Sequence, residues 1–173
     1  GLLETLKAAF TPSVCKGIAA YMAPAGMAAD DWWIVGGGNK DSTDPKHKDE
    51  PFIAFANENL AAGGLDPAIS LYAIGYAYGY PHTEALRVAA ELPGGLTRTN
   101  FILAVRNIDI WSPQTLDGIT TALNGAADAF FIEGSDFSRF DATAQSWNMV
   151  GDVVDANGAS PSCAWDKDRG GCR

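Results

Sequence analysis

The segment 94–118, GGLTRTNFILAVRNIDIWSPQTLDG, places a helix start, an amphipathic helix and a proline stop within one short span. Thr97 is a favoured N-cap residue, because its hydroxyl can accept a hydrogen bond from a free backbone N–H of the first turn. Pro113 ends the helical pattern, since proline lacks the backbone donor that a helix interior needs. The sequence therefore predicts a helix over 97–107 with one apolar face. The residues of that face are Phe101, Ala104, Val105 and Ile108.

Three other segments combine with this helix into a family pattern. They are GYAYGYPHTEALRVAAELP before it, and NGAADAFFIEG and SWNMVGDVVDANG after it. With them the chain resembles the carboxy-terminal half of the branched-chain amino acid type substrate-binding proteins of ABC importers, most strongly over 66–172. The resemblance implies an α/β chain that forms part of the two-lobed type I periplasmic-binding-protein fold, whose three-layer α/β/α lobes are joined by crossover strands. It also implies that the amino-terminal half is missing.

The resemblance divides the chain into three parts. Residues 1–33 would end the second lobe, 34–145 would complete the first lobe, and 146–173 would cross back to the second lobe and end in a tail. Most ligand-contacting residues of this family lie on loops of the half that is missing. The resemblance therefore predicts the architecture in more detail than the ligand contacts.

The composition indicates which classes of protein this chain fits. Hydrophobic residues make up 47% of the 173 positions, which is enough to bury a core. The formal net charge of -9 disfavours a nucleic-acid partner, because binding phosphates requires clustered lysines and arginines. No apolar run reaches the roughly 18 residues of a membrane helix. The start of the chain lacks a cationic leader and a cleavage site, which fits a mature or truncated product of an exported protein.

The three cysteines bear on the cellular compartment. Cys163 and Cys172 enclose a short loop rich in charge and glycine. A disulfide between them would pin the tail, and the sequence favours that bond over two free thiols. Cys15 is then left over, and it could be a reactive thiol, a buried thiol or a bridge to the missing half. We predict the bridge, because no flanking histidine or basic cluster activates this cysteine.

The first half of the chain predicts a strand, a loop and a helix. The apolar run 31–36, DWWIVG, is typical of a strand buried on both faces or of a crossover between lobes, and we expect the crossover. The polar segment 39–50 lacks periodicity and predicts an exposed loop. Asp49 is expected to cap a helix that stops at Gly63 and Gly64. The apolar side of that helix would carry Phe52, Phe55, Ala56 and Leu60.

A longer helix is predicted over 66–92, where an Asp-Pro pair provides a typical helix entry. Pro81 should kink or divide it, because proline removes one backbone hydrogen bond. Gly75 and Gly79 are spaced by four and lie on one helical face. This spacing favours the close approach of a neighbouring backbone over clearance for a ligand.

After the helix at 97–107 the pattern changes from helical to extended. Segments 119–123 and 129–132 predict a hairpin around Asn124 and Gly125, because Asn-Gly tolerates the positive φ angles of a tight turn. A third strand is expected within 146–154. Helices followed by antiparallel strands suit the second half of a bilobal binding protein.

Catalytic motifs are not found in the sequence. No nucleophile elbow, phosphate-binding loop or zinc-protease motif occurs. His47 and His82 fall in separate elements and predict no metal site. Glu133 and Asp136 leave a paired-carboxylate hydrolase open, although solvated carboxylates beside a turn are the preferred interpretation. The sequence therefore predicts no catalytic residue, no metal and no cofactor.

Tyrosines provide the more suggestive signal for a binding site. Four of them crowd the helix over 66–92, and a tyrosine combines an apolar ring with a hydroxyl, which suits a small-ligand cleft. In the resembled family the start of this helix faces the cleft between the lobes. The nearest equivalent positions are Leu71 and Tyr72, so the resemblance implies that these two residues bind ligand.

The family mechanism is binding without bond making. A small ligand contacts both lobes and stabilises the closed form, while the crossover strands absorb the rotation. The two expected crossover segments, 33–36 and 146–154, therefore contain the predicted hinge residues. These are Trp33, Gly36 and Trp147.

The resemblance implies an extracytoplasmic solute-binding component of an ABC importer, located in the periplasm or at the outer face of the cell membrane. It would capture a small polar metabolite, such as an amino acid, an amide or a related organic acid. Its partners would be that small-molecule ligand, an ABC permease in the membrane, and the missing half of the same protein through Cys15. A ligand-sensing bilobal receptor domain and the carboxylate hydrolase are the alternatives.

Overall fold

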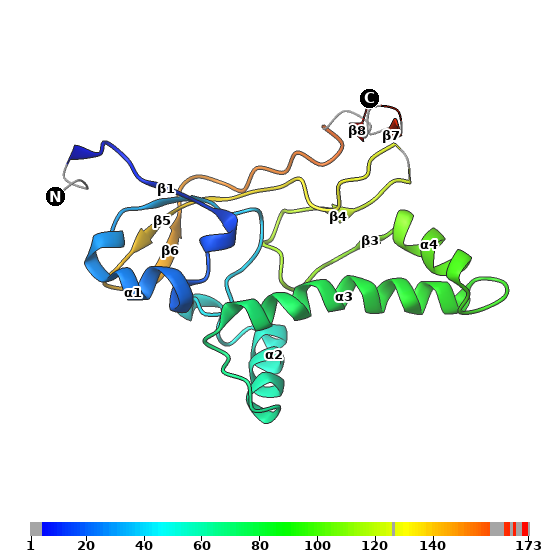
Figure 1. Ribbon diagram of the computed structural model, residues 1–173, viewed down its shortest axis with the longest axis horizontal. Helices are drawn as coiled ribbons and strands as arrows, with labels where there is room; N and C mark the ends of the chain where they lie inside the picture. The colour runs from blue at the N-terminus through cyan, green and yellow to red at the C-terminus, as the bar shows by residue number, and fades with distance from the viewer. Residues whose placement is uncertain (1–4, 126, 160–164, 167, 169–170, 173) are drawn as a thin grey trace.

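The structure is a computed structural model that describes residues 5–125, 127–159, 165–166, 168 and 171–172. It is mixed α/β, as the sequence predicts, with helices packed beside a mixed four-stranded sheet (Figure 1). The helices are α1 (Ala23–Ala25), α2 (Pro51–Ala62), α3 (Ser70–Glu91) and α4 (Arg98–Arg106), with short turns η2 (Ser13–Cys15), η3 (Ile18–Met22), η4 (Gly26–Ala29) and η5 (Pro45–His47). The strands are β1 (Phe10–Pro12), β2 (Trp33–Val35), β3 (Asp109–Ile110), β4 (Thr121–Ala122), β5 (Phe137–Asp141), β6 (Ser146–Met149), β7 (Trp165–Asp166) and β8 (Gly171–Cys172).

The main sheet has the strand order β1-β2-β5-β6, in which β1 and β2 run parallel and the other neighbours antiparallel. One face of this sheet carries the first core cluster, in which Ile34, Phe140 and Trp147 pack against η3 and η4. Segment 31–36 does form a strand, but Val35 is 43% exposed. A strand buried on both faces, the alternative to a crossover, is therefore not what forms here, because residues alternate between a packed and an open face, and the crossover stays a prediction.

Strands from all three predicted parts of the chain share this sheet. β2 begins at Trp33 and pairs with β5, while β6 follows β5 as the next antiparallel strand. The expected boundary after residue 33 thus falls within β2. The expected boundary after residue 145 falls between β5 and β6, which are hydrogen-bonded to each other.

The helix predicted within segment 94–118 is confirmed as α4. Thr97 is its N-cap, and the Thr97 hydroxyl accepts from the backbone N–H of Asn100 at 3.1 Å. The predicted apolar face packs against Ala85 and Ala89 of α3 to form the second core cluster. Figure 1 shows α3 extending away from the sheet, with α4 folded back beside its far end. Local sequence therefore determines this helical hairpin.

Helix α2 starts one residue later than predicted, because Glu50 and not Asp49 is its N-cap. Its end is confirmed. Gly64 has φ +76°, and Leu65 N–H donates to Leu60 O at 2.9 Å, so the helix closes with a Schellman motif. Its buried residues are Ile53, Ala56 and Leu60, whereas Phe55 is 52% exposed.

Helix α3 begins at Ser70 and continues through Pro81, so this proline does not divide the helix, and the alternative that Pro81 kinks it stays a prediction. The side chains of His82 and Thr83 bond to carbonyls of the preceding turn, at 2.6 and 2.9 Å. The close backbone approach predicted at Gly75 and Gly79 is also wrong. A Cβ added at either glycine would meet no atom within 4 Å, because both positions face outward.

The predicted hairpin forms only in part. Gly125 has φ +53°, Asn124 and Asp128 form an antiparallel bridge, and Ala122 N–H donates to Phe131 O at 3.2 Å across the two arms. The ladder of strand β4, however, is with β3 and not with 129–132. The strand expected within 146–154 is confirmed in its first half, as β6.

Two sequence predictions concern the termini and the membrane. The bond predicted between Cys163 and Cys172 falls outside the residues whose side chains the structure describes. Among the described residues, no helix combines the length and apolarity that crossing a bilayer requires.

Candidate functional site

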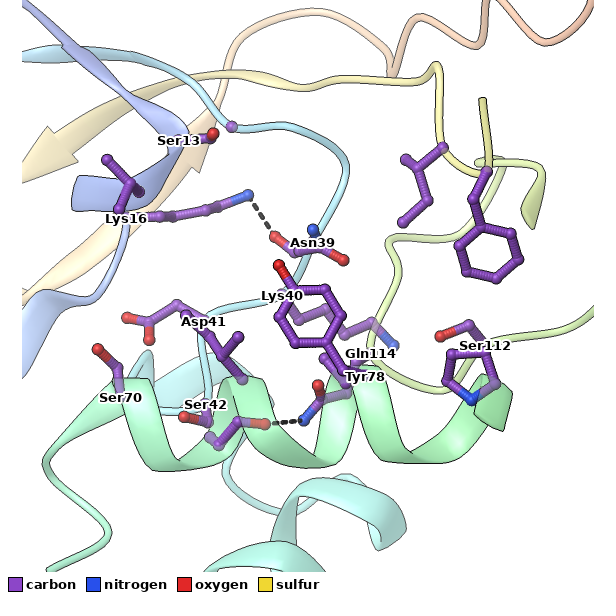
Figure 2. A pocket seen from close by; sticks show the side chains of 18 of the residues that line it. Ser13, Lys16, Asn39, Lys40, Asp41, Ser42, Ser70, Tyr78, Ser112 and Gln114 are labelled. Atoms are coloured by element: carbon purple, nitrogen blue, oxygen red, sulfur yellow. Dashed lines mark hydrogen bonds between the residues drawn. The ribbon is translucent and has the colours of Figure 1, made fainter. Parts of the chain in front are cut away.

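A cavity of about 420 Å³ lies between the sheet and helix α3. The segment 13–17 and the segment that follows β2 supply its polar side, and the first half of α3, from Ser70 to His82, forms its floor (Figure 2). Residues of α4 and of the β3–β4 region close the far end. The far end of the cavity thus adjoins the second core cluster.

The far end of the cavity is apolar. Val105, Ile108, Leu123 and Phe131 line it, and all four also belong to the second core cluster. The face of α4 that the sequence predicts as buried therefore serves two purposes, since it packs against α3 and offers apolar surface to a ligand. Apolar pockets with a few polar groups at one end are typical of small-molecule sites.

The polar end depends on the turn that follows β2. Gly37 and Gly38 have φ of +67° and +73°, in the region that favours glycine. A Cβ at Gly38 would lie 2.9 Å from Gly134 O, so the chain passes close to a neighbouring backbone here. This turn brings the segment from Asn39 to Ser42 to the cavity wall.

Lys16 and Asp136 form a buried ion pair at the polar end. Lys16 Nζ lies 2.8 Å from Asp136 Oδ1 and donates to Asn39 O at 2.6 Å. Ser138 Oγ donates to the other carboxylate oxygen at 2.7 Å. Burial lowers the pKa of the Lys16 ammonium below its usual value, and the charge and hydrogen bond of Asp136 offset part of that shift. This pair joins two segments that are 120 positions apart in sequence.

The segment 39–50 is largely a loop, but the prediction that it is exposed is wrong for Asp41, Ser42, Asp44 and His47, which are buried. Asp41 and Asp44 are 6% and 1% exposed. Asp41 accepts from the backbone N–H of Ile18, and Asp44 accepts from the backbone N–H of Trp147 at 3.0 Å. Burial raises the pKa of Asp41, although its hydrogen bonds oppose the change. The two buried carboxylates of this loop are therefore hydrogen-bonded by backbone donors from distant segments.

Lys40, His47 and Glu50 form a second polar cluster beside the cavity. Lys40 Nζ lies 2.6 Å from one carboxylate oxygen of Glu50, and His47 Nδ1 lies 2.6 Å from the other. Burial acts to raise the pKa of Glu50, but the hydrogen bonds from Lys40 and His47 outweigh it and lower the pKa. The Lys40 ammonium, which lines the cavity, is therefore already paired.

The predicted ligand residues lie beside the cavity and do not line it. Leu71 and Tyr72 are 52% and 38% exposed on the outer side of α3. Their neighbours Ser70 and Ala73, together with Tyr78, face the cavity instead. The predicted residues therefore lie on the same helix as this cavity but on its exposed side, and ligand binding by Leu71 and Tyr72 stays a prediction.

The predicted hinge residues lie in or next to the sheet. Trp33 stacks on Phe10 at 6.2 Å between ring centroids, and the Arg139 guanidinium lies 5.3 Å above its indole ring. Trp147 is 1% exposed, and its indole N–H donates to Lys16 O at 2.7 Å. Gly36 is buried at the cavity wall, against Asp136. A hinge role for the three residues stays a prediction.

The carboxylates considered for hydrolysis are engaged separately. Asp136 binds Lys16 and Ser138, and Glu133 Oε2 accepts from the backbone N–H of Gly158 at 2.7 Å. Within the described part of the chain, no group of three or more His, Cys, Asp or Glu side chains is placed to hold a metal ion. Cys15 is a partly exposed free thiol in η2, beside the cavity wall.

Sequence reasoning missed the residues that form the polar end, namely Lys16, Asp41 and Ser42. A signal was present, because the segment 39–50 combines several acidic residues with three preceding glycines. Such glycines allow close backbone approach, and carboxylates can accept several backbone N–H groups in a buried turn.

Comparisons with protein-family models, with curated proteins and with solved structures give no match to this chain. The functional proposal below therefore depends on the geometry of the cavity and on the residue patterns of the sequence.

Proposed function

We propose that this chain is part of a solute-binding protein that holds a small amphipathic molecule in the cavity between the sheet and α3. The observation that carries the proposal is the cavity itself, which has a polar end around Lys16 and an apolar end around Ile108. Its volume of about 420 Å³ falls within the range of small-ligand sites. The sequence resemblance supports the finer proposal that the protein is the extracytoplasmic binding component of an ABC importer with a type I periplasmic-binding-protein fold.

The arrangement favours binding over catalysis. The ionic groups at the polar end are each held by partners within the protein, so none of them is positioned as a free nucleophile or base. Binding energy would come from removing apolar ligand surface from water and from hydrogen bonds at the polar end. A captured solute would then pass to a permease in the membrane, without bond making.

Filling the cavity should abolish ligand binding. In an Ala77→Trp variant the indole would occupy the middle of the cavity, which Ala77 lines. We expect thermal-shift hits from a panel of amino acids, amides and organic acids to disappear, since a ligand at 100 times its Kd otherwise stabilises by about 2.7 kcal/mol. Ala90→Trp is the matched control, because Ala90 is exposed on the same helix. Equal shifts in the two variants would contradict the proposed site.

The importer role makes a separate prediction in cells. Deleting the gene should reduce uptake of the compound that the thermal-shift panel identifies, and expressing the Ala90→Trp variant from a plasmid should restore it. The Ala77→Trp variant should fail to restore it, since the solute could no longer be captured. Uptake that is unchanged by the deletion would argue against transport while leaving solute binding intact.

A further inference from the structure

The charged groups at the polar end of the cavity are already engaged by partners within the protein. Lys16 binds Asp136 and Asn39 O, and Lys40 binds Glu50 and Pro113 O. Asp41 has no cationic partner in the ranges that the structure describes, but both of its carboxylate oxygens accept hydrogen bonds, from Ile18 N–H and from the N–H and the hydroxyl of Thr43. A charged ligand head would lose its hydration here without meeting a charged group whose hydrogen-bonding positions are free.

Neutral hydrogen-bonding capacity remains at the same end. Ser42 lines the cavity and is 8% exposed, and its hydroxyl has no hydrogen-bond partner among the described residues. A serine hydroxyl moves between staggered rotamers, so Ser42 Oγ can turn toward the cavity that its residue lines. Gln114 is 5% exposed and donates one amide hydrogen to Ala73 O at 3.4 Å. Its side chain still offers a second N–H and a carbonyl oxygen.

We propose that the cavity selects an uncharged amphipathic molecule whose head is a primary amide. This inference rests on the proposed function and names the substrate class of that site. A primary amide donates and accepts, as do the Ser42 hydroxyl and the Gln114 amide, and Figure 2 shows both residues on the same side of the cavity. The apolar chain of the ligand would extend toward Ile108 and Phe131. Satisfying the buried Ser42 hydroxyl provides specificity, because an unpartnered buried polar group is unfavourable.

Three probes with the same tail test the head group directly. Calorimetric titration of the protein with 4-phenylbutanamide should give a Kd at least about tenfold lower than with 4-phenylbutanoate or 4-phenylbutylamine, because only the amide head is neutral. Acid or amine binding as tightly as the amide would overturn this inference but leave the proposed function standing. A second outcome would contradict both the amide inference and the proposed function. In that outcome none of the three probes binds, and the metabolite panel gives no thermal shift that is lost in the Ala77→Trp variant.

Ser42→Ala separates a ligand contact from a structural role. The variant should weaken 4-phenylbutanamide binding about fivefold, the effect of one neutral hydrogen bond, while its melting temperature does not fall. The control is Ser146→Ala, because Ser146 Oγ donates to Asp44 Oδ1 at 2.8 Å away from the cavity lining. That variant should lose melting temperature and keep its amide affinity. Unchanged amide affinity in Ser42→Ala would contradict the assignment of this hydroxyl.

Discussion

Replacing Asp136 by alanine should lower the free energy of unfolding by about 3–5 kcal/mol, the cost of leaving one member of a buried ion pair without its partner. Asp136 is 2% exposed and binds both the Lys16 ammonium and the Ser138 hydroxyl. Urea denaturation at neutral pH provides the measurement. Glu91→Ala is the control, because Glu91 belongs to an exposed ion pair with Arg87, whose loss should change the free energy of unfolding far less.

The pH dependence of this destabilisation follows from Lys16. Burial lowers the pKa of the Lys16 ammonium, and removing Asp136 removes the interaction that opposes that shift. At alkaline pH below the ordinary pKa of lysine, the unfolded Asp136→Ala variant then binds more protons than the folded variant. The free energy of unfolding of this variant, relative to that of wild type, therefore rises with pH. Adding Lys16→Met should restore much of the stability at neutral pH. A loss below about 1 kcal/mol in Asp136→Ala at neutral pH would contradict the role of the pair.

Replacing Gly36 by alanine should destabilise the protein by about 3 kcal/mol, at the upper end of the range for overpacking a core. The new Cβ would lie 1.9 Å from Asp136 Oδ1, so the carboxylate would have to move away from Lys16. The space is closed because Gly36 N–H also donates to Asp136 O at 2.8 Å, which fixes the two segments against each other. Denaturation at equilibrium measures the change.

The same substitution at Gly75 should have the opposite sign. Gly75 lies inside α3, and a Cβ added there would meet no atom within 4 Å. Alanine is preferred over glycine in a helix interior by roughly 0.5–1 kcal/mol, so Gly75→Ala should stabilise by that amount. Equal effects of the two substitutions would show that the contact of Gly36 with Asp136 does not control stability.

The elements that sequence reasoning predicted well are those with local causes. The Thr97 cap, the apolar face of α4 and the stop after α2 each depend on residues within one or two turns of each other. Hydrogen bonds and side-chain contacts over such distances follow from spacing alone. The existence and type of these helices could therefore be read directly from the chain.

The elements that were missed depend on contacts between distant segments. Asp41 and Asp44 of the polar loop 39–50 are buried, and η3 and β6 provide the backbone donors that make their burial possible. Nothing within the loop indicates these donors, and polar composition alone predicts exposure. The same applies to Lys16 and Asp136, whose pairing requires the sheet to bring them together.

The side chains at the start of α3 differ in direction because of helical phase. Each residue advances the side-chain direction by about 100° along an α-helix. Ser70 and Ala73 line the cavity, whereas Leu71 and Tyr72, which the resemblance implies as ligand residues, lie on the exposed side of the same helix. The face that a helix presents depends on its packing, which the helical pattern of this segment does not specify.

The strand order of the main sheet also constrains how this chain folds during synthesis. β1 and β2 leave the ribosome long before β5, whose residues pair with β2 from about a hundred positions further along. The α3–α4 hairpin needs only neighbouring residues and can assemble first. Until β5 arrives, one edge of β2 has unpaired backbone groups that other chains could capture. Nascent copies of this protein are therefore most vulnerable to aggregation after α4 has formed and before residues 137–149 emerge.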